Sequence, residues 1–414
     1  MRAAVSHSKL TLIVRVLLPF AAGYFLSYLY RVVNAVIAPD LIKVFQLDAD
    51  QLGLLTGAYF LTFAAAQLPL GIALDRFGAR RTEALLLVFA AAGAFVFAAA
   101  GSFTGLIVGR ALIGFGVSAC LMAAFKAFVV WFAKARLPLI NGCQMAAGGL
   151  GAIAATTPTE AALTVTDWRG VFIGLGALTL LCAGAILAFV PAEAGPVGGR
   201  MPTRALIAGV GRIYRSSLFW RVAPATILSQ ASFLAIQGLW SGRWLAAVEG
   251  LPRAEVASTL FLIAAAMIAG FLSLGWAAER LGRLAIPPMA LAIAGMSAFV
   301  VSQVVITAGW FAGSPWPWIA FGFFGTAGIV PYAALSQRFP AALAGRLNTA
   351  LNVLVFVVAF ASQWGIGVVI SRWTEAFGGD PANGYRAAFT LMLALQAATT
   401  LWFFVFHREQ VPQH

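Results

Sequence analysis

Charged residues are scarce in this sequence: Asp, Glu, Lys and Arg make up 10% of its 414 residues, against 61% hydrophobic residues. Soluble domains carry about 25% charged residues, so this chain has too little polar surface to fold as a water-soluble globule. We therefore expect the lipid bilayer to be its solvent. A hydrocarbon core about 30 Å thick needs about 20 apolar residues per helix, and the chain has room for about twelve such helices.

Cysteine and histidine are also rare. The three cysteines fall inside apolar runs, where a thiol behaves as a small hydrophobic group: Cys120, Cys143 and Cys182. No disulfide framework is expected. The three histidines lie near the ends of the chain, which excludes a histidine proton relay within the membrane.

Residue patterns typical of enzymes are absent as well. No His, Cys, Asp or Glu cluster has the spacing of a metal site or a catalytic constellation. No glycine-rich phosphate-binding loop is present that could power an ATP-driven pump. We therefore expect no metal, no cofactor and no catalytic residue. A channel is the other alternative, which the internal repetition described below disfavours, because duplicated halves favour a rocking transporter.

Long apolar runs predict twelve membrane-spanning helices, which makes the fold class all-α. They lie at residues 12–41, 52–73, 83–101, 103–131, 139–161, 170–190, 221–246, 254–276, 286–308, 317–336, 346–370 and 387–406. Residues 191–220 are rich in Gly, Pro and Arg and read as an exposed linker. The chain is thereby divided into six helices in residues 1–190 and six in residues 221–414.

The distribution of basic residues predicts the orientation. Most of the 27 Lys and Arg residues fall in segments that lie on one side of the membrane, and such segments are retained in the cytoplasm. This predicts a multi-pass protein of a bacterial-type inner membrane with both termini cytoplasmic. The net charge of +13 then reflects topology, and no nucleic-acid partner is expected.

Two short motifs recur at corresponding places in the two halves. The segment GIALDRFG at 71–78 returns as GWAAERLG at 275–282, each between the second and third helix of its half. The segment WRGVF at 168–172 returns as YRAAF at 385–389. Such repetition is typical of transporters built from duplicated halves.

The segment GIALDRFGARR resembles the signature of the major facilitator superfamily. This resemblance implies two pseudo-symmetric bundles of six helices, a monomer, and alternating access. It also implies a latch that closes the cytoplasmic side in the outward-facing state; the alternative is a solvated basic turn. The latch residues would be Gly71, Asp75, Arg76, Gly78 and Arg80, with Glu279 and Arg280 in the second copy.

The first helix carries an arginine close to the middle of its apolar span. The segment from Tyr28 to Leu41 resembles the anion:cation symporter branch, in which this arginine binds the carboxylate of organic anions. The resemblance places Arg31 in the substrate site, beside Tyr28, Tyr30 and Asn34. Tyr30 stands where that branch has an aspartate, so the coupling mechanism differs. A structural role for Arg31 is the alternative, because a buried cation needs partners.

Three further charged residues are candidates for function. Lys126, before Trp131, resembles a lysine of the same branch and is expected in the cavity, unless its long side chain reaches the membrane surface instead. Arg110 resembles the second superfamily signature, with either an architectural or a coupling role. Nearly all acidic residues fall in loops or at helix ends. Glu160 is therefore the one candidate for a protonatable coupling group, with a loop-facing position as the alternative.

Polar residues of the second half complete the expected pocket: Gln237, Trp240, Tyr332 and Asn352. Amides within membrane spans also bond across helices, so packing is the alternative for some of them. The sequence thus predicts proton-coupled transport of a small anionic solute bearing a carboxylate. Efflux of drug-like or cationic compounds is the alternative, which the lack of buried carboxylates disfavours.

Overall fold

The computed structural model describes residues 9–133, 136–192, 203–284, 286–378 and 380–406. All regular structure in these residues is helical, which confirms the expected all-α class. Ten helices among the described residues are long and apolar enough to cross a membrane. Twelve segments were expected, and the difference of two has two causes. The second and third are merged into α4 (Ala49–Ala99), which bends at Gly78, and the fifth contains the shorter apolar helix Leu139–Ala154.

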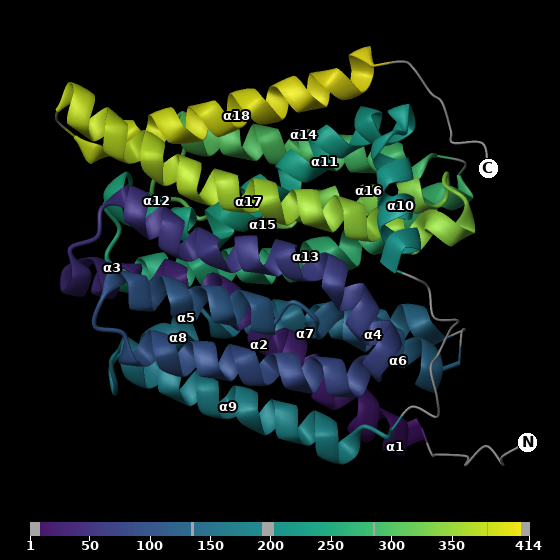
Figure 1. Ribbon diagram of the computed structural model, residues 1–414. Helices are drawn as coiled ribbons and strands as arrows, with labels where there is room; N and C mark the ends of the chain where they lie inside the picture. Colours follow the sequence, from purple (N-terminus) through teal and green to yellow (C-terminus); the bar gives the residue numbers. More distant parts are fainter. Residues whose placement is uncertain (1–8, 134–135, 193–202, 285, 379, 407–414) are drawn as a thin grey trace, which may run out of the picture.

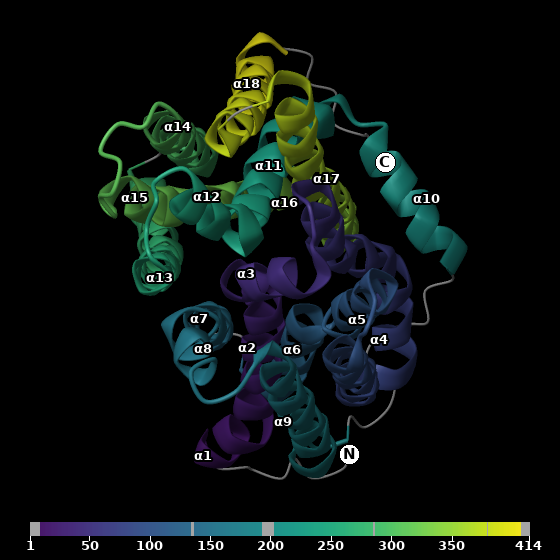
Figure 2. The ribbon, with the colours of Figure 1, turned by 90° about the vertical axis from the view of Figure 1, so that its left-hand side faces the viewer.

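The first half of the chain forms one group of helices in Figure 2. Its elements are α1 (Lys9–Leu12), η1 (Ile13–Leu17), α2 (Leu18–Val32), α3 (Asn34–Phe45), α4, α5 (Phe103–Gly116), α6 (Cys120–Trp131), α7 (Leu137–Ala154), α8 (Thr157–Ala162) and α9 (Trp168–Phe189).

The second half forms the other group in the same view. Its elements are α11 (Ser217–Ala235), η3 (Ile236–Trp240), α12 (Ser241–Ala247), α13 (Arg253–Arg283), α14 (Pro288–Thr307), α15 (Trp316–Phe324), η4 (Gly325–Ile329), α16 (Val330–Ser336), α17 (Ala341–Phe377) and α18 (Pro381–Val405). The helices of both groups run nearly parallel in Figure 1.

The segment expected to be an exposed linker contains a helix. Residues 193–202 lie outside the described part of the chain, and α10 (Thr203–Tyr214) follows them. The Tyr214 hydroxyl donates to the Ala350 carbonyl of α17 at 3.0 Å. Part of the expected linker is therefore packed against the second half.

Glycines allow the two halves to approach closely where α4 meets α17. A Cβ on Gly53 would lie 2.7 Å from the Gln363 carbonyl oxygen, and one on Gly367 would lie 2.3 Å from the Ala49 carbonyl oxygen. Both distances are too short for any side chain, so the helix backbones touch here, as small residues permit in membrane bundles.

The first membrane helix carries a proline near its end. Pro39 lies inside α3 and lacks the N–H that would bond to the Ala35 carbonyl four residues earlier. Gly242 of α12 packs against this carbonyl, at a distance where an added Cβ would be 2.7 Å from the oxygen. This end of α3 therefore lies in the contact between the two halves.

Candidate functional site

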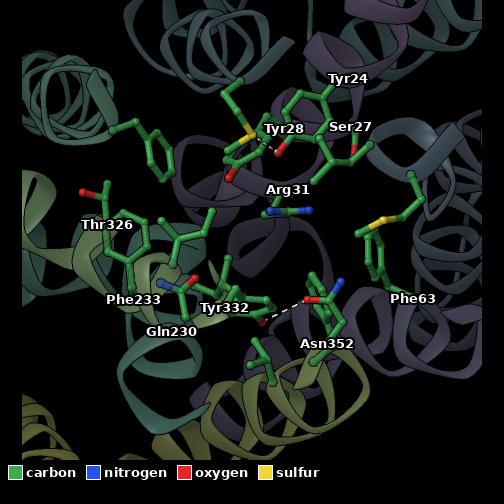
Figure 3. Close-up of a pocket in the computed structure, with 18 of the residues that line it drawn as sticks. Tyr24, Ser27, Tyr28, Arg31, Phe63, Gln230, Phe233, Thr326, Tyr332 and Asn352 are labelled. Atoms are coloured by element: carbon green, nitrogen blue, oxygen red, sulfur yellow. Dashed lines mark hydrogen bonds between the residues drawn. The ribbon is translucent and has the colours of Figure 1, made fainter. Parts of the chain in front are cut away.

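A cavity of about 410 Å³ lies between the two halves, within the size range of small-molecule sites. Its lining comes from α2, α4, α6 and α7 on one side and from α11, α13, α16 and α17 on the other. Aromatic and aliphatic side chains predominate, and the polar groups are few. Figure 3 shows these groups converging on one space.

Arg31 is the cationic side chain of the cavity lining. Its guanidinium carbon lies 4.4 Å from the centre of the Tyr28 ring, 5.6 Å from that of Phe356 and 5.7 Å from that of Phe63. These distances allow cation–π attraction. Among the described residues no carboxylate pairs with it, and its Nε has no hydrogen-bond partner. The cation is therefore available to an anion in the cavity (Figure 3).

Hydroxyl and amide groups of the second half face Arg31 across the cavity (Figure 3). The Tyr332 hydroxyl donates to Asn352 Oδ1 at 3.0 Å, which leaves the Asn352 amide nitrogen free to donate to a ligand. Gln230 and Thr326 line the same wall. The site thus combines one positive charge with several neutral hydrogen-bonding groups.

Helical geometry decides which predicted residues of the first helix reach the cavity. Tyr28 and Arg31 share one face of α2 and line the cavity, whereas Tyr30 lies off that face. Asn34 begins α3 beyond the turn at Val33 and does not line the cavity either. The Tyr30 hydroxyl and Thr179 Oγ1 are hydrogen-bonded at 2.9 Å, and Asn34 Nδ2 donates to Thr56 Oγ1 at 2.9 Å. These two side chains hold the first helix to its own half.

In the second half, Tyr332 and Asn352 line the cavity, but Gln237 and Trp240 do not. Both lie on the π-helix η3 and are buried. Gln237 Nε2 donates to Met267 Sδ at 3.3 Å, and Trp240 Nε1 donates to the Gln363 carbonyl at 3.0 Å. These contacts join η3 to α13 and α17.

Several lining residues were not predicted from the sequence. The signal for two of them is spacing, because Tyr24 and Ser27 precede Arg31 by seven and four residues and therefore share its helix face. Thr326 gives no comparable signal, because nothing in one sequence shows which side of its helix faces the other half.

The profile of the Major Facilitator Superfamily matches residues 20–363. The chain belongs to this superfamily. It is accordingly a membrane transporter and not an enzyme.

Several proteins of similar sequence are named as transporters of anionic solutes. The hexuronate transporter of Escherichia coli K12 is 25% identical over 307 residues, 69% of this chain and 68% of that protein. The probable sulfoacetate transporter SauU of Cupriavidus necator is 29% identical over 38% of this chain, and the match spans only 36% of that protein. The galacturonate transporter of Dickeya chrysanthemi is 28% identical over 39% of this chain and 47% of its own length.

Solved structures agree in fold. A bacterial homologue of the human lysosomal transporter Spinster, in an inward-facing and unoccupied conformation, has a TM-score of 0.76 at 18% identity, covering 98% of this chain and 100% of its own. A D-xylose–proton symporter has a TM-score of 0.75 at 14% identity, covering 95% of this chain and 97% of its own.

Lys126 of this transporter lies in the signature region and not in the cavity. Its Nζ is 2.6 Å from Asp75 Oδ1 and 2.8 Å from the Leu74 carbonyl. The auxiliary cation expected in the cavity is thus paired within the first half. The preceding residue, Phe125, does line the cavity.

The signature itself forms a turn between two arms of α4. Gly78 has φ of 77°, a backbone conformation that favours glycine. Arg80 donates to the Leu187 carbonyl of α9, and Arg76 lies over the Phe77 ring at 5.3 Å. In the second copy, Arg280 lies 5.3 Å from the Trp276 ring. The Glu279 side chain lies outside the described part of the chain.

Arg110 has an architectural contact. It is fully buried on α5, its Nη1 donates to the Tyr30 carbonyl at 2.8 Å, and its guanidinium lies 5.3 Å from the Tyr59 ring. The bond satisfies a carbonyl of α2 just before Arg31. Arg110 therefore fixes the part of α2 that presents Arg31.

Glu160 belongs to an ionic group at the opposite end of the helices from Asp75. Arg253 of α13 bonds both oxygens of Asp40, at 3.0 and 2.8 Å, and its Nε is 2.7 Å from Glu160. Asp40 and Glu160 come from the first half and Arg253 from the second. We call these three residues the Arg253 group; it ties the halves together at this end.

One acidic residue contradicts the expectation that carboxylates avoid the interior. Glu83 is fully buried inside α4. The sequence interpretation was wrong because it began a helix at residue 83 and so took Glu83 for a helix end, whereas α4 continues through the Gly78 bend into the bundle.

Proposed function

We propose that this transporter carries a small organic anion through the cavity by alternating access, with Arg31 binding the carboxylate of the solute. The observation that carries the proposal is the Arg31 guanidinium at the cavity, where no carboxylate among the described residues pairs with it and its Nε has no hydrogen-bond partner. A planar guanidinium matches a carboxylate with two parallel hydrogen bonds. In an enclosed site the attraction is also stronger than in water.

The opposite wall favours a solute with hydroxyl groups. Gln230, Tyr332 and Asn352 provide donors and acceptors facing Arg31, and such neutral groups discriminate between hydroxylated and apolar solutes. Sugar acids combine one carboxylate with several hydroxyls. The names of the hexuronate and galacturonate transporters support this class.

Alternating access is supported by the asymmetry of the contacts between the halves. The Arg253 group joins them at one end, whereas Asp75 at the other end pairs with Lys126 of its own half. We propose that this conformation is closed at the Arg253 end, on the outer side. The signature end then faces the cytoplasm, with both termini, in a bacterial inner membrane.

Proton coupling is part of the proposal, and Glu160 supports it. A protonated Glu160 would lose its ionic attraction to Arg253, which would weaken the outer closure. Arg110 is assigned an architectural role, because its hydrogen bond holds α2. The protein is proposed to act as a monomer.

Efflux of drug-like or cationic compounds is the second candidate. The aromatic lining favours it, since Phe63, Phe233 and Phe356 would bind lipophilic compounds. Arg31 opposes a cationic solute, which would place like charges together in an enclosed site. The anionic class therefore fits the charge of the cavity better.

A panel of ligands distinguishes transport of organic anions from efflux of drug-like or cationic compounds. Purified protein is heated with sugar acids, other carboxylates, neutral sugars and lipophilic cations, beside Arg31→Ala. A ligand at one hundred times its dissociation constant stabilises the folded state by about 2.7 kcal/mol. Stabilisation by carboxylates that Arg31→Ala abolishes is expected. Stabilisation by cations alone, equal in the variant, would reject the anion assignment.

A further inference from the structure

Glu83 is a buried carboxyl group that the proposed site does not use. Both of its oxygens are buried, and neither has a hydrogen-bond partner among the described residues. A Cβ added to Gly23 of α2 would lie 2.3 Å from Glu83 Oε1. The carboxyl therefore lies against the backbone of α2, in the space that a side chain at position 23 would enter.

The groups around Glu83 are polar but uncharged. The titratable groups that face it are the thiols of Cys120 on α6 and Cys182 on α9. On α7, Gln144 Nε2 donates to the carbonyls of Phe20 and Cys120, at 3.1 and 3.3 Å, and its Oε1 has no partner. In the described residues no Lys, Arg or His pairs with Glu83.

An ionised carboxylate in this position would lack both water and a counter-ion, which is very unfavourable. A protonated carboxyl is neutral, and its O–H can be donated to a neighbouring acceptor. Ionisable residues inside membranes are retained for function. We propose that Glu83 is a proton-binding site of this transporter, protonated in this conformation and able to release its proton to water in another.

The surroundings of Glu83 connect it to the cavity. Two of its neighbours, and the Gln144 that bonds to the Cys120 carbonyl, each precede a residue of the cavity lining by one position. These pairs are Gly23 with Tyr24 on α2, Cys120 with Leu121 on α6, and Gln144 with Met145 on α7. A change in the cavity wall therefore moves the groups that enclose the carboxyl.

The chain leaves the helical conformation just before Cys120, so such movement can occur there. Residues 117–119 form a turn between α5 and α6, and α6 begins at Cys120. On the opposite side of Glu83, α2 carries Arg31 eight residues after Gly23, about 12 Å along the helix. Binding of an anion at Arg31 and exposure of Glu83 are thus linked through α2 and α6.

The proposal deepens the proposed function and rests on it for its coupling role. Infrared difference spectra between acidic and alkaline protein test the proton site without any substrate. A buried protonated carboxyl band is expected in the full-length wild type and in Glu255→Gln, whose substituted carboxyl is exposed. The band should be absent from Glu83→Gln. Equal spectra of wild type and Glu83→Gln would overturn the proposal.

A variant that keeps the carboxyl covers the case in which Glu83→Gln does not fold. Cys120→Ser places a stronger donor beside Glu83 and is expected to shift the frequency of the same band. An unshifted band would assign the signal to another group and overturn the proposal.

Transport in proteoliposomes tests coupling. Glu83→Gln is expected to keep exchange of galacturonate at equal pH and to lose accumulation driven by a proton gradient, whereas Glu255→Gln keeps both. Undiminished gradient-driven accumulation by Glu83→Gln would contradict the proposal. If the wild type moves no carboxylate at all, the proposed function fails, and the spectra still decide whether Glu83 binds a proton.

Discussion

The guanidinium of Arg31 lies 4.4 Å from the centre of the Tyr28 ring, three residues earlier on the same face of α2. The ring supports the cation on one side and leaves its other side toward the cavity (Figure 3). A buried cation normally has a carboxylate partner. Aromatic support of this kind stabilises the charge without neutralising it, which keeps Arg31 available to an anionic solute.

Replacing Arg31 tests its role as the anion anchor. Arg31→Ala removes a charge-assisted hydrogen bond worth about 1.5–3 kcal/mol, so affinity for a carboxylate should fall about 10- to 100-fold. Arg31→Lys keeps the charge but loses the two parallel bonds, and should lose less. Binding is measured by calorimetry or by competition in the purified protein. Equal affinities in all three proteins would contradict the assignment.

Replacing Tyr28 tests the aromatic support. Tyr28→Leu removes the ring beneath the cation and should weaken carboxylate binding by about 0.5–2 kcal/mol. Tyr28→Phe keeps the ring and is the matched control, with a smaller loss expected. Binding curves for the two variants distinguish ring from hydroxyl. If Tyr28→Phe loses as much as Tyr28→Leu, the hydroxyl is what matters.

Breaking the Arg253 group should open the end of the protein that it closes. Arg253→Gln removes the bonds to Asp40 and Glu160, and Arg253→Lys is the charge-retaining control. Ser241, fully buried near this end, is changed to Cys in each protein. Labelling by a membrane-impermeant thiol reagent should be faster with Arg253→Gln. Labelling at the same rate in both would show that these bonds do not hold the closure.

Helix contact at Gly114 should be sensitive to a single methyl group. A Cβ there would lie 2.2 Å from the Tyr59 carbonyl oxygen, whereas a Cβ on Gly174 would meet nothing within 4 Å. Gly114→Ala should destabilise the fold by about 1–3 kcal/mol, and Gly174→Ala should not destabilise it. Thermal unfolding of the two variants checks this. A Gly114→Ala protein as stable as the control would reject the close packing.

The fold was predictable because two independent signals agreed. Apolar runs gave the helices, and the repeated motifs at 71–78 and 275–282 gave the duplication. The apolar runs do not show whether two neighbouring helices are continuous. The bend at Gly78 joins two expected helices into α4, and this single difference hid the burial of Glu83.

The candidate site was predictable only in part. Arg31 was singled out because a cation in the middle of an apolar helix is costly without a function, and Tyr28 was placed beside it by the resemblance of this segment to the anion:cation symporter branch. Tyr30 was placed beside them by sequence position, although helix geometry turns it toward Thr179. The pairing of Lys126 with Asp75 joins residues 51 positions apart, and one sequence does not reveal such a contact.

A transport assay decides whether the protein carries an organic anion that binds to Arg31. Purified protein in proteoliposomes is loaded with galacturonate, and exchange with labelled galacturonate outside is measured for wild type and Arg31→Ala. We expect rapid exchange by the wild type, competition by other hydroxylated carboxylates, and loss of exchange in Arg31→Ala at low substrate concentration. Exchange that is absent from the wild type, or unchanged by Arg31→Ala, would contradict an anion transporter anchored at Arg31.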